Sequence, residues 1–407
     1  MTPSALADRD AVVVSVRRGP IGRARKGSLA AERPEDLAVS VVRAALEDVP
    51  ALPARDLDDF YLGCAVPEGA QNENPARRVA VLAGLDSLPA VTVNRFCASS
   101  VQALRMAANA VRAGDADAVL VGGMESVSSA QQRDQSRHPA FDEAQERAED
   151  RFRTQQPWSD PRDAGLMPDV YIPMGMTAEF VARTTSTSRA EQDSWALQSQ
   201  LRAARAIDSG FFAREITPYR RSDGSTVDTD DGPRPTTTSE ALSGLAPAFL
   251  AGGTVTAGNS SPLNDGASAA IVMSAARAAQ LGITPLARIL GSSATALSPE
   301  VMGLGPIEAT RTVLRRTGMT LGDIDIVELN EAFAAQVVPT VRQLDLDPDR
   351  VNPFGGAIAL GHPFGATGIR MLATLLNGLR ARDQSIGLLT LCVGGGQGMG
   401  MIVERLS

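Results

Sequence analysis

Two stretches of the sequence decide the fold: residues 98–115, ASSVQALRMAANAVRAGD, and residues 366–383, ATGIRMLATLLNGLRARD. Apolar side chains recur in both at the spacing of an amphipathic helix. A short apolar run ending in glycines follows each stretch, as is typical of a buried parallel strand. At an offset of 268 positions the matching pairs are Ala98/Ala366, Ser99/Thr367, Val101/Ile369, Asn109/Asn377, Arg112/Arg380, Ala113/Ala381 and Asp115/Asp383.

Other predicted elements repeat around these two stretches in the same order. Residues 57–64 align with 324–331 at an offset of 267. A helical segment precedes each of them, and a β-rich run precedes each helical segment, at 11–16 and 286–290. Four elements in one order at a nearly constant offset indicate two copies of one βαβαβ-type half, so we expect an α/β protein with a duplicated core.

The segment between the two copies, residues 126–250, has a different character. It is rich in glutamine, serine, arginine, aspartate and proline, and one clear helix is predicted in it, over about 188–209. A polar insertion of this length is usually a lid or binding loop, with disorder as the alternative. We therefore expect one half from 1–125 with 251–278, the insertion at 126–250, and a second half from 279–407.

Composition excludes several classes of protein. The 407-residue chain has a formal net charge of −8, which argues against a sequence-independent nucleic-acid binder. No stretch approaches the roughly 18 consecutive apolar residues of a membrane span. The start has no apolar run of signal-peptide length, so we expect a cytoplasmic protein. Three cysteines and two histidines without ligand spacing predict neither a disulfide framework nor a metal site.

Cys97 is the first candidate for chemistry. It lies in residues 93–100, VNRFCASS, where a β-rich run turns into the predicted helix. A thiol there would face the unpaired amides and the positive end of the helix dipole, which favour the thiolate. The alternative is a small buried cysteine with no role, but the strand-to-helix position favours a nucleophile.

His362 is the second candidate. It lies in the glycine-dense segment 352–368, NPFGGAIALGHPFGATG, which leads into the second copy of the helix. The alternatives are a phosphate-binding loop, for which the Gly-Lys-Ser/Thr pattern is missing, and a histidine that caps the core. The repeat places His362 close to the Cys97 turn, which favours a catalytic base.

Cys392 and Asn330 each follow an apolar strand pattern in the second half. Ligands bind at the carboxyl ends of strands in open α/β sheets, so both side chains are expected to face one crevice. The amide of Asn330 could hold a water or polarise an oxygen. We expect Cys64 to be structural and His138 to be solvated.

The motifs together resemble the signatures of the thiolase family. They are NRFCASS at 94–100, NEAFAAQ at 330–336, GHPFGATG at 361–368, CVGGGQG at 392–398, and a fifth, GTVTAGNSSPLNDG, at 253–266. The resemblance runs from about residue 11 to the end. It implies a thiolase-like five-layer αβαβα core, with the loop domain at 126–250 inserted to bind coenzyme A.

The resemblance also implies residue roles. Cys97 becomes acylated, His362 takes its proton, and Cys392 moves the proton on the α-carbon of the second acyl-CoA. Asn330 would hold a water that forms one oxyanion hole with His362, and the backbone amides of Cys97 and Gly394 would form the other.

Coenzyme A and acyl-CoA are then the substrates and partners. Arg234 and Ser261 match positions that contact the nucleotide and the pantetheine of coenzyme A. The chemistry needs no permanently bound cofactor and no metal, because a sulfur nucleophile exchanges thioesters directly. Since members of the family form dimers or tetramers, we expect a homodimer or a homotetramer.

The sequence also bears on the direction of the reaction. Pro173 stands where acetoacetyl-CoA-forming members tend to carry a histidine. The proline resembles the degradative 3-ketoacyl-CoA thiolases of fatty-acid β-oxidation, and the biosynthetic acetyl-CoA acetyltransferase is the alternative. A condensing ketosynthase would need a second catalytic histidine or an asparagine in place of Cys392. The intact motifs disfavour a catalytically silent acyl-CoA-binding protein.

Overall fold

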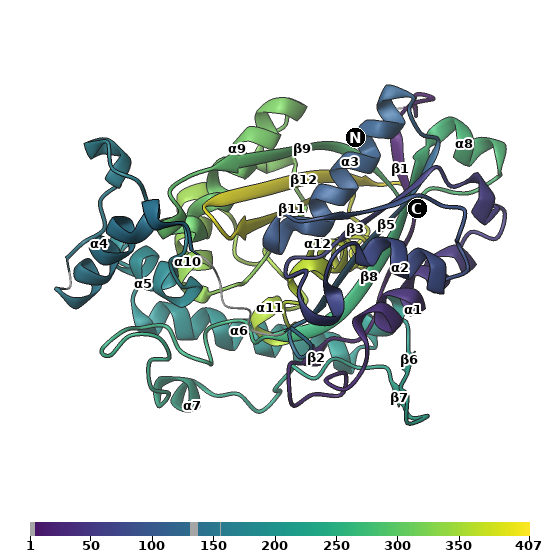
Figure 1. Ribbon diagram of the computed structural model, residues 1–407. Coiled ribbons are helices and arrows are strands. Elements are labelled where there is room, and N and C mark those ends of the chain that lie inside the picture. Colours follow the sequence, from purple (N-terminus) through teal and green to yellow (C-terminus); the bar gives the residue numbers. More distant parts are fainter. Residues whose placement is uncertain (1–4, 131–136, 155) are drawn as a thin grey trace.

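The computed structural model describes residues 5–130, 137–154 and 156–407. The first residues of the expected N-terminal half (1–4), and 131–136 and 155 of the expected insertion, lie outside the described residues. One mixed sheet organises the fold (Figure 1). Its strands, in order across the sheet, are β10 (Ile326–Leu329), β11 (Ile386–Val393), β12 (Gln397–Arg405), β9 (Ala287–Ala296), β1 (Ala11–Arg18), β8 (Asn264–Ser274), β5 (Ala118–Ser126), β3 (Asp59–Gly63) and β4 (Ala90–Val93), and the short β2 (Gly22–Arg23) pairs with β8.

The sheet is built from two halves with the same topology. From β1 outward the order is β8, β5, β3, and from β9 outward it is β12, β11, β10. In each half the first two pairings are antiparallel and the third is parallel. The halves join where Val12 and Val13 of β1 pair with Arg288 and Ala287 of β9. The predicted duplication is therefore confirmed, and β4 is a strand of the first half without a counterpart in the second.

Helices form three further layers. The first helical layer consists of α3 (Ser99–Ala113) and α12 (Thr367–Ala381). These two helices share one apolar core with strands of both halves and lie in the middle of the molecule (Figure 1). A second core joins α1 (Pro34–Glu47), α2 (Pro75–Leu82) and α8 (Ala275–Gln280) to the first half. A third joins α9 (Gly305–Thr317) and α10 (Ala334–Leu344) to the second half. With the two halves of the sheet as the two β layers, the result is the expected five-layer αβαβα arrangement.

Burial explains the composition of the central strands. Every residue of β5 and β8 is buried, as expected for strands covered by helices on both faces. Helix α3 ends at Gly114, whose φ of 84° is the left-handed conformation that glycine adopts without strain. Both strands, β5 and β8, are therefore buried over their full length.

The insertion contains more helix than the sequence predicted. The predicted helix is present as α6 (Arg189–Asp208), begun by a capping box of Ser188 and Glu191. The expectation of a single clear helix was wrong, because α4 (Asp142–Arg153), α5 (Met174–Thr184) and α7 (Ser239–Ser243) are also present, with the small hairpin β6 (Tyr219–Arg220) and β7 (Thr226–Val227). Helix α4 is polar and buries only Ala144, Ala148 and Phe152, a stripe too narrow to stand out in the sequence.

Candidate active site

The turn that carries Cys97 is held in an uncommon conformation. Cys97 is the middle residue of the 3₁₀ turn η3 (Phe96–Ala98), between β4 and α3. Phe96 has a φ of 44°, which is rare for a bulky residue. The side-chain oxygen of Asn94 accepts from the Phe96 amide at 2.8 Å, and the hydroxyl of Ser99 donates to the Phe96 carbonyl at 2.6 Å. These motif side chains stabilise a strained backbone next to the candidate nucleophile.

The surroundings of the Cys97 sulfur favour the neutral thiol. Its own backbone amide and that of Gly394 form hydrogen bonds to the sulfur, which favour the thiolate. Loss of solvent is the larger effect and raises the pKa of Cys97 to about 12. The expectation that the helix terminus would favour a thiolate at rest was therefore wrong. The side chain is only partly buried, but a base is needed to ionise it.

Cys392 and Gly394 lie beside Cys97. Cys392 is fully buried near the end of β11, and its pKa is raised by burial and by the neighbouring charge of an ionised Cys97. The structure therefore brings both cysteines and the Gly394 amide together, as the motifs predicted. Cys64 is buried in the core of the first half, and His138 is exposed and caps a turn.

His362 is a buried neutral imidazole whose hydrogen-bond partners define its tautomer. The hydroxyl of Thr367 donates to the Pro363 carbonyl at 2.9 Å and lies 2.7 Å from His362 Nδ1. With that hydroxyl hydrogen on the Pro363 carbonyl, Nδ1 carries the proton, and the lone pair of Nε2 accepts from the side-chain amide of Asn330 at 3.3 Å. Burial, aided by the positive charge of Arg370, lowers the pKa of His362 to about 3. Its Nε2 is thus available as a base.

Asn330 faces this base. Its side-chain nitrogen lies 3.3 Å from His362 Nε2, and it follows β10 directly. Gln336 donates to the Asn330 carbonyl at 2.7 Å and fixes the loop. The side-chain oxygen of Asn330 is buried and has no hydrogen-bond partner. A buried polar oxygen without a partner is a place where a water or a ligand group fits.

Long-range hydrogen bonds that the sequence reasoning missed assemble these loops. The guanidinium of Arg95 donates to the side chain of Gln397 at 2.7 Å and so ties the Cys97 turn to the segment that contains Gly394. The side-chain oxygen of Asn264 accepts from the His362 amide at 2.9 Å. All four of these side chains lie within the quoted motifs: Arg95, Thr367, Asn264 and Gln397. Their place in the motifs was the only sign in the sequence that they belong to the site.

The two candidate coenzyme A residues lie outside the buried cluster. Arg234 is exposed on the insertion, and its pKa is lowered by partial burial and by the nearby positive charge of Arg23. Its segment packs tightly on the short helix α11 (Ala357–Leu360), where a Cβ on Gly232 would collide with the Ala359 carbonyl. Ser261 donates through its amide and hydroxyl to the Ala332 carbonyl, beside Asn330.

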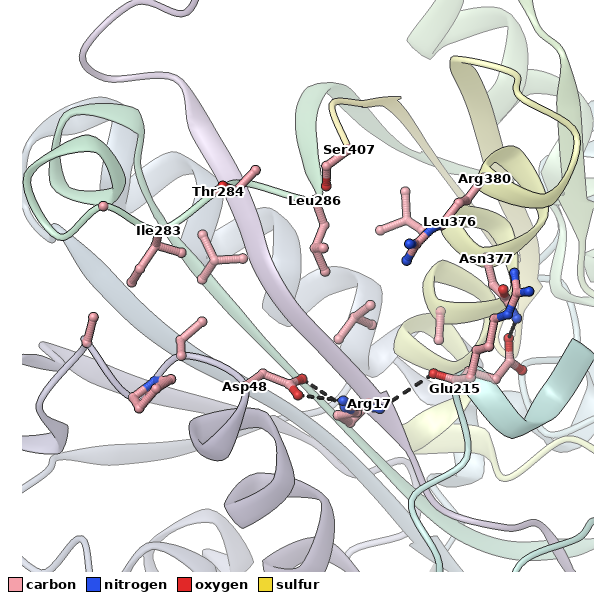
Figure 2. A pocket seen from close by; sticks show the side chains of 18 residues that line it. Arg17, Asp48, Glu215, Ile283, Thr284, Leu286, Leu376, Asn377, Arg380 and Ser407 are labelled. Carbon is pink, nitrogen blue, oxygen red and sulfur yellow. Dashed lines mark hydrogen bonds and ion pairs between the residues drawn. The ribbon is translucent and has the colours of Figure 1, made fainter.

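A separate cleft lies far along α12 from these groups. It has a volume of about 560 Å³ and is lined by Leu376, Asn377 and Arg380 of that helix. Figure 2 shows Arg17 and Asp48 paired across from them. None of the predicted site residues lines this cleft. In the described part of the chain no cluster of three or more histidine, cysteine or acidic side chains could hold a metal ion, and no helix is long and apolar enough to cross a bilayer.

Comparisons with known proteins agree with the motifs. The family model "Thiolase, N-terminal domain" matches residues 11–276, and "Thiolase, C-terminal domain" matches residues 283–405. The 3-ketoacyl-CoA thiolase of Bacillus subtilis (strain 168) is 39% identical, over 97% of this chain and 99% of its own. The acetyl-CoA acetyltransferase of Escherichia coli (strain K12) is 41% identical, over 98% and 100%. The crystal structure of the Bacillus anthracis acetyl-CoA acetyltransferase is 35% identical, with a TM-score of 0.87 over 99% of this chain and 100% of that one. The chain therefore belongs to the thiolase family.

Proposed function

We propose that the protein is an acyl-CoA C-acyltransferase that cleaves 3-ketoacyl-CoA with coenzyme A into acetyl-CoA and a shortened acyl-CoA, and catalyses the reverse condensation. One observation carries the proposal. A buried neutral histidine stands just before the η9 turn, which packs against the η3 turn of Cys97, and Cys97 has a second thiol beside it and two amides at its sulfur. This is the set of groups that acyl transfer through a cysteine requires.

In the first step, His362 Nε2 takes the proton of Cys97 and the sulfur attacks the keto carbon of the substrate. The amides of Cys97 and Gly394, which already point at the sulfur, would receive the developing oxyanion. The bond between the keto carbon and the α-carbon then breaks. Its electron pair stays on the α-carbon, which takes the proton of Cys392, and acetyl-CoA leaves an acyl group on Cys97.

The enolate that forms during cleavage also needs hydrogen-bond donors. A water that donates one hydrogen to the unpartnered side-chain oxygen of Asn330 has its other hydrogen free for the enolate oxygen. Protonation of His362 at Nε2 breaks its contact with the Asn330 amide nitrogen, 3.3 Å away, and leaves the new N–H as a second donor for the enolate. In the second step coenzyme A gives its thiol proton to Cys392 and attacks the acyl group, and Cys97 recovers its proton from His362.

Coenzyme A recognition is assigned to the insertion, residues 126–250, between halves formed by 1–125 with 251–278 and by 279–407. The paired positive charges of Arg23 and Arg234 suit its phosphates, and Ser261, beside Asn330, suits the pantetheine. No permanently bound cofactor is required. We further propose a cytoplasmic homodimer or homotetramer.

The proline at position 173, which precedes α5, favours the degradative direction in fatty-acid β-oxidation. Steady-state thiolysis over a ladder from acetoacetyl-CoA to long-chain 3-ketoacyl-CoA tests this preference. A degradative enzyme should cleave the longer substrates at least as well as acetoacetyl-CoA. Activity confined to acetoacetyl-CoA would instead support a biosynthetic acetyltransferase.

The proposed reaction itself is tested by mass spectrometry after the protein is mixed with a 3-ketoacyl-CoA. The acyl mass should appear on the peptide that contains Cys97. It should be absent from the Cys97→Ala variant and unaffected in Cys64→Ala, because Cys64 is buried in a different core. An acyl group found on Cys64 or Cys392 would refute the assignment.

A further inference from the structure

The duplicated halves contain two copies of the turn that carries Cys97. At the repeat offset of 268, position 97 corresponds to Gly365, and η3 (Phe96–Ala98) corresponds to η9 (Phe364–Ala366). Each turn leads into a helix of 15 residues. In the first copy, the amide at position 97 lies at the reactive sulfur. In the second copy, the equivalent amide of Gly365 is already occupied.

Its occupant is the carboxylate of Glu125, from the end of β5. The Gly365 amide donates to Glu125 Oε2 at 2.8 Å. The same carboxylate accepts from the amides of Ala65 at 2.9 Å and Val66 at 3.1 Å, just after β3. The side-chain amide of Gln71 donates to it at 3.1 Å. Four donors from three segments therefore converge on one side chain.

Among the described residues, no cation pairs with this carboxylate. Glu125 is fully buried, and it forms no salt bridge with any residue in the described ranges. Burial raises the pKa of Glu125, and the hydrogen bonds from the four amide donors oppose that rise, which is how an oxyanion hole holds an anion. In the second half the protein's own carboxylate thus occupies the site that a substrate oxyanion would occupy in the first.

The loop that follows His362 packs tightly at this contact. A Cβ on Gly365 would collide with the Met124 carbonyl and lie 2.8 Å from the Gly63 carbonyl. A Cβ on Gly123 would collide with the Gly365 carbonyl in turn. The loop therefore lies directly on the ends of β3 and β5, three residues beyond His362. The η3 turn of Cys97 packs against the same η9 turn.

We propose that Glu125 is a positioning residue for acyl transfer, which fills the repeat-equivalent amide site and fixes the His362 loop beneath the Cys97 turn. This inference rests on the proposed function, because it concerns the geometry between the base and the nucleophile. A displacement of about 1 Å between reacting groups costs on the order of 10²-fold in rate.

The charge of Glu125 also affects the pKa of nearby thiols, which can be measured independently of protein stability. The titratable groups that face it are Cys97 and Cys64, and its charge raises the pKa of both thiols. Arg78 of α2 lowers the pKa of Cys64. A neutral side chain at position 125 should therefore make Cys97 easier to ionise, and a shorter charged one should not.

The test compares Glu125→Gln, Glu125→Asp and the control Glu32→Gln, a buried carboxylate bound by Tyr219 and Ser222 far from the site. In Glu125→Gln one oxygen becomes an NH₂ group that faces N–H donors, so kcat for thiolysis should fall about 10²-fold, with KM for coenzyme A changed less than about twofold. The pH midpoint for iodoacetamide labelling of Cys97 should move lower. Glu125→Asp should lose kcat with that midpoint unchanged, and Glu32→Gln should change neither.

Wild-type kcat in Glu125→Gln would overturn the inference, as would a loss of activity that only follows the unfolded fraction while the labelling midpoint stays fixed. If Glu125→Gln fails to fold, Glu125→Asp decides the question through its kcat, because it keeps the charge but cannot reach Gly365 and the β3 end together. Acylation of wild-type Cys97 is measured in the same series. Its failure would refute the proposed function, whereas normal acylation with an inert position 125 would refute this inference alone.

Discussion

The Cys97 turn and the Gly365 turn have the same construction and opposite environments. Each is a three-residue 3₁₀ turn before a 15-residue helix. Cys97 is partly exposed, and its own amide and that of Gly394 donate to its sulfur. Gly365 is buried without room for a side chain, and its amide is bound by Glu125. The two copies of the turn are thus used differently: the first carries the proposed nucleophile, and the second binds a carboxylate from the other half of the molecule.

The largest difference between the turns should be in stability. Gly365→Ala forces a methyl group against two backbone carbonyls and should cost about 1–3 kcal/mol or more. Cys97→Ala removes a partly exposed thiol and should cost less than about 1 kcal/mol, although both variants lose thiolysis. Urea unfolding monitored by circular dichroism measures the two costs. Equal losses of unfolding free energy in the two variants would mean that the Gly365 turn is not more tightly packed than the Cys97 turn.

The next effect is the pH dependence of stability that His362 causes. The repeat aligns His362 with Asn94 of the first turn. The folded protein lowers the pKa of His362 to about 3, against the ordinary value of 6.5 in the unfolded chain. As the pH falls below 6.5 the unfolded chain takes up a proton that the folded protein does not. Stability should therefore fall toward pH 3, by at most about 1.4 kcal/mol per pH unit.

His362→Asn, which gives the second turn the residue of the first, should remove this contribution and lower thiolysis by about 10²–10⁴-fold. The exposed His138→Asn variant is the control and should keep the wild-type slope. Glu328, whose pKa is raised to about 8, contributes a slope of opposite sign between its ordinary 4.5 and that value. It does so in all three proteins, so the difference between their unfolding free energies isolates His362. An identical slope in His362→Asn would contradict the buried neutral base.

The smallest effect is expected outside both turns. Arg234→Ala should raise KM for coenzyme A about tenfold and change kcat less than about twofold, because a remote charge contributes equally to ground-state and transition-state binding. Arg214 is an exposed arginine that lines the separate cleft of about 560 Å³, and Arg214→Ala should change neither constant. An unchanged KM in Arg234→Ala would assign the phosphates to other arginines.

The sequence predicted the parts of the fold that depend on local pattern. Strong apolar periodicity located α3, α12 and the strands that follow them, and the constant offset revealed the duplication. Helices α4 and α5 were missed because the insertion lacks that periodicity. Helix α4 buries a single narrow stripe, and it is stabilised by its contacts rather than by its own pattern.

The candidate residues could likewise be predicted, but not their environment. Cys97 and His362 are recognisable from their motifs, whereas the burial that keeps one a thiol and the other neutral depends on the whole fold. The bond from Gly365 to Glu125 joins residues 240 positions apart. No periodicity reports such a contact. The repeat nevertheless aligns Gly365 with Cys97, and this alignment identifies the Gly365 amide as the counterpart of the Cys97 amide.

The central claim is that the open turn carries the acyl group on Cys97 while Cys392 moves only the proton on carbon. It is tested by measuring Cys392→Ser in two reactions side by side. Acyl exchange between acetyl-CoA and labelled coenzyme A needs Cys97 and His362 and should be retained. Condensation needs a base at the α-carbon, and a serine hydroxyl has far too high a pKa to act as one, so it should fall by at least about 10²-fold. Equal loss of both reactions would contradict the division of labour between the two cysteines.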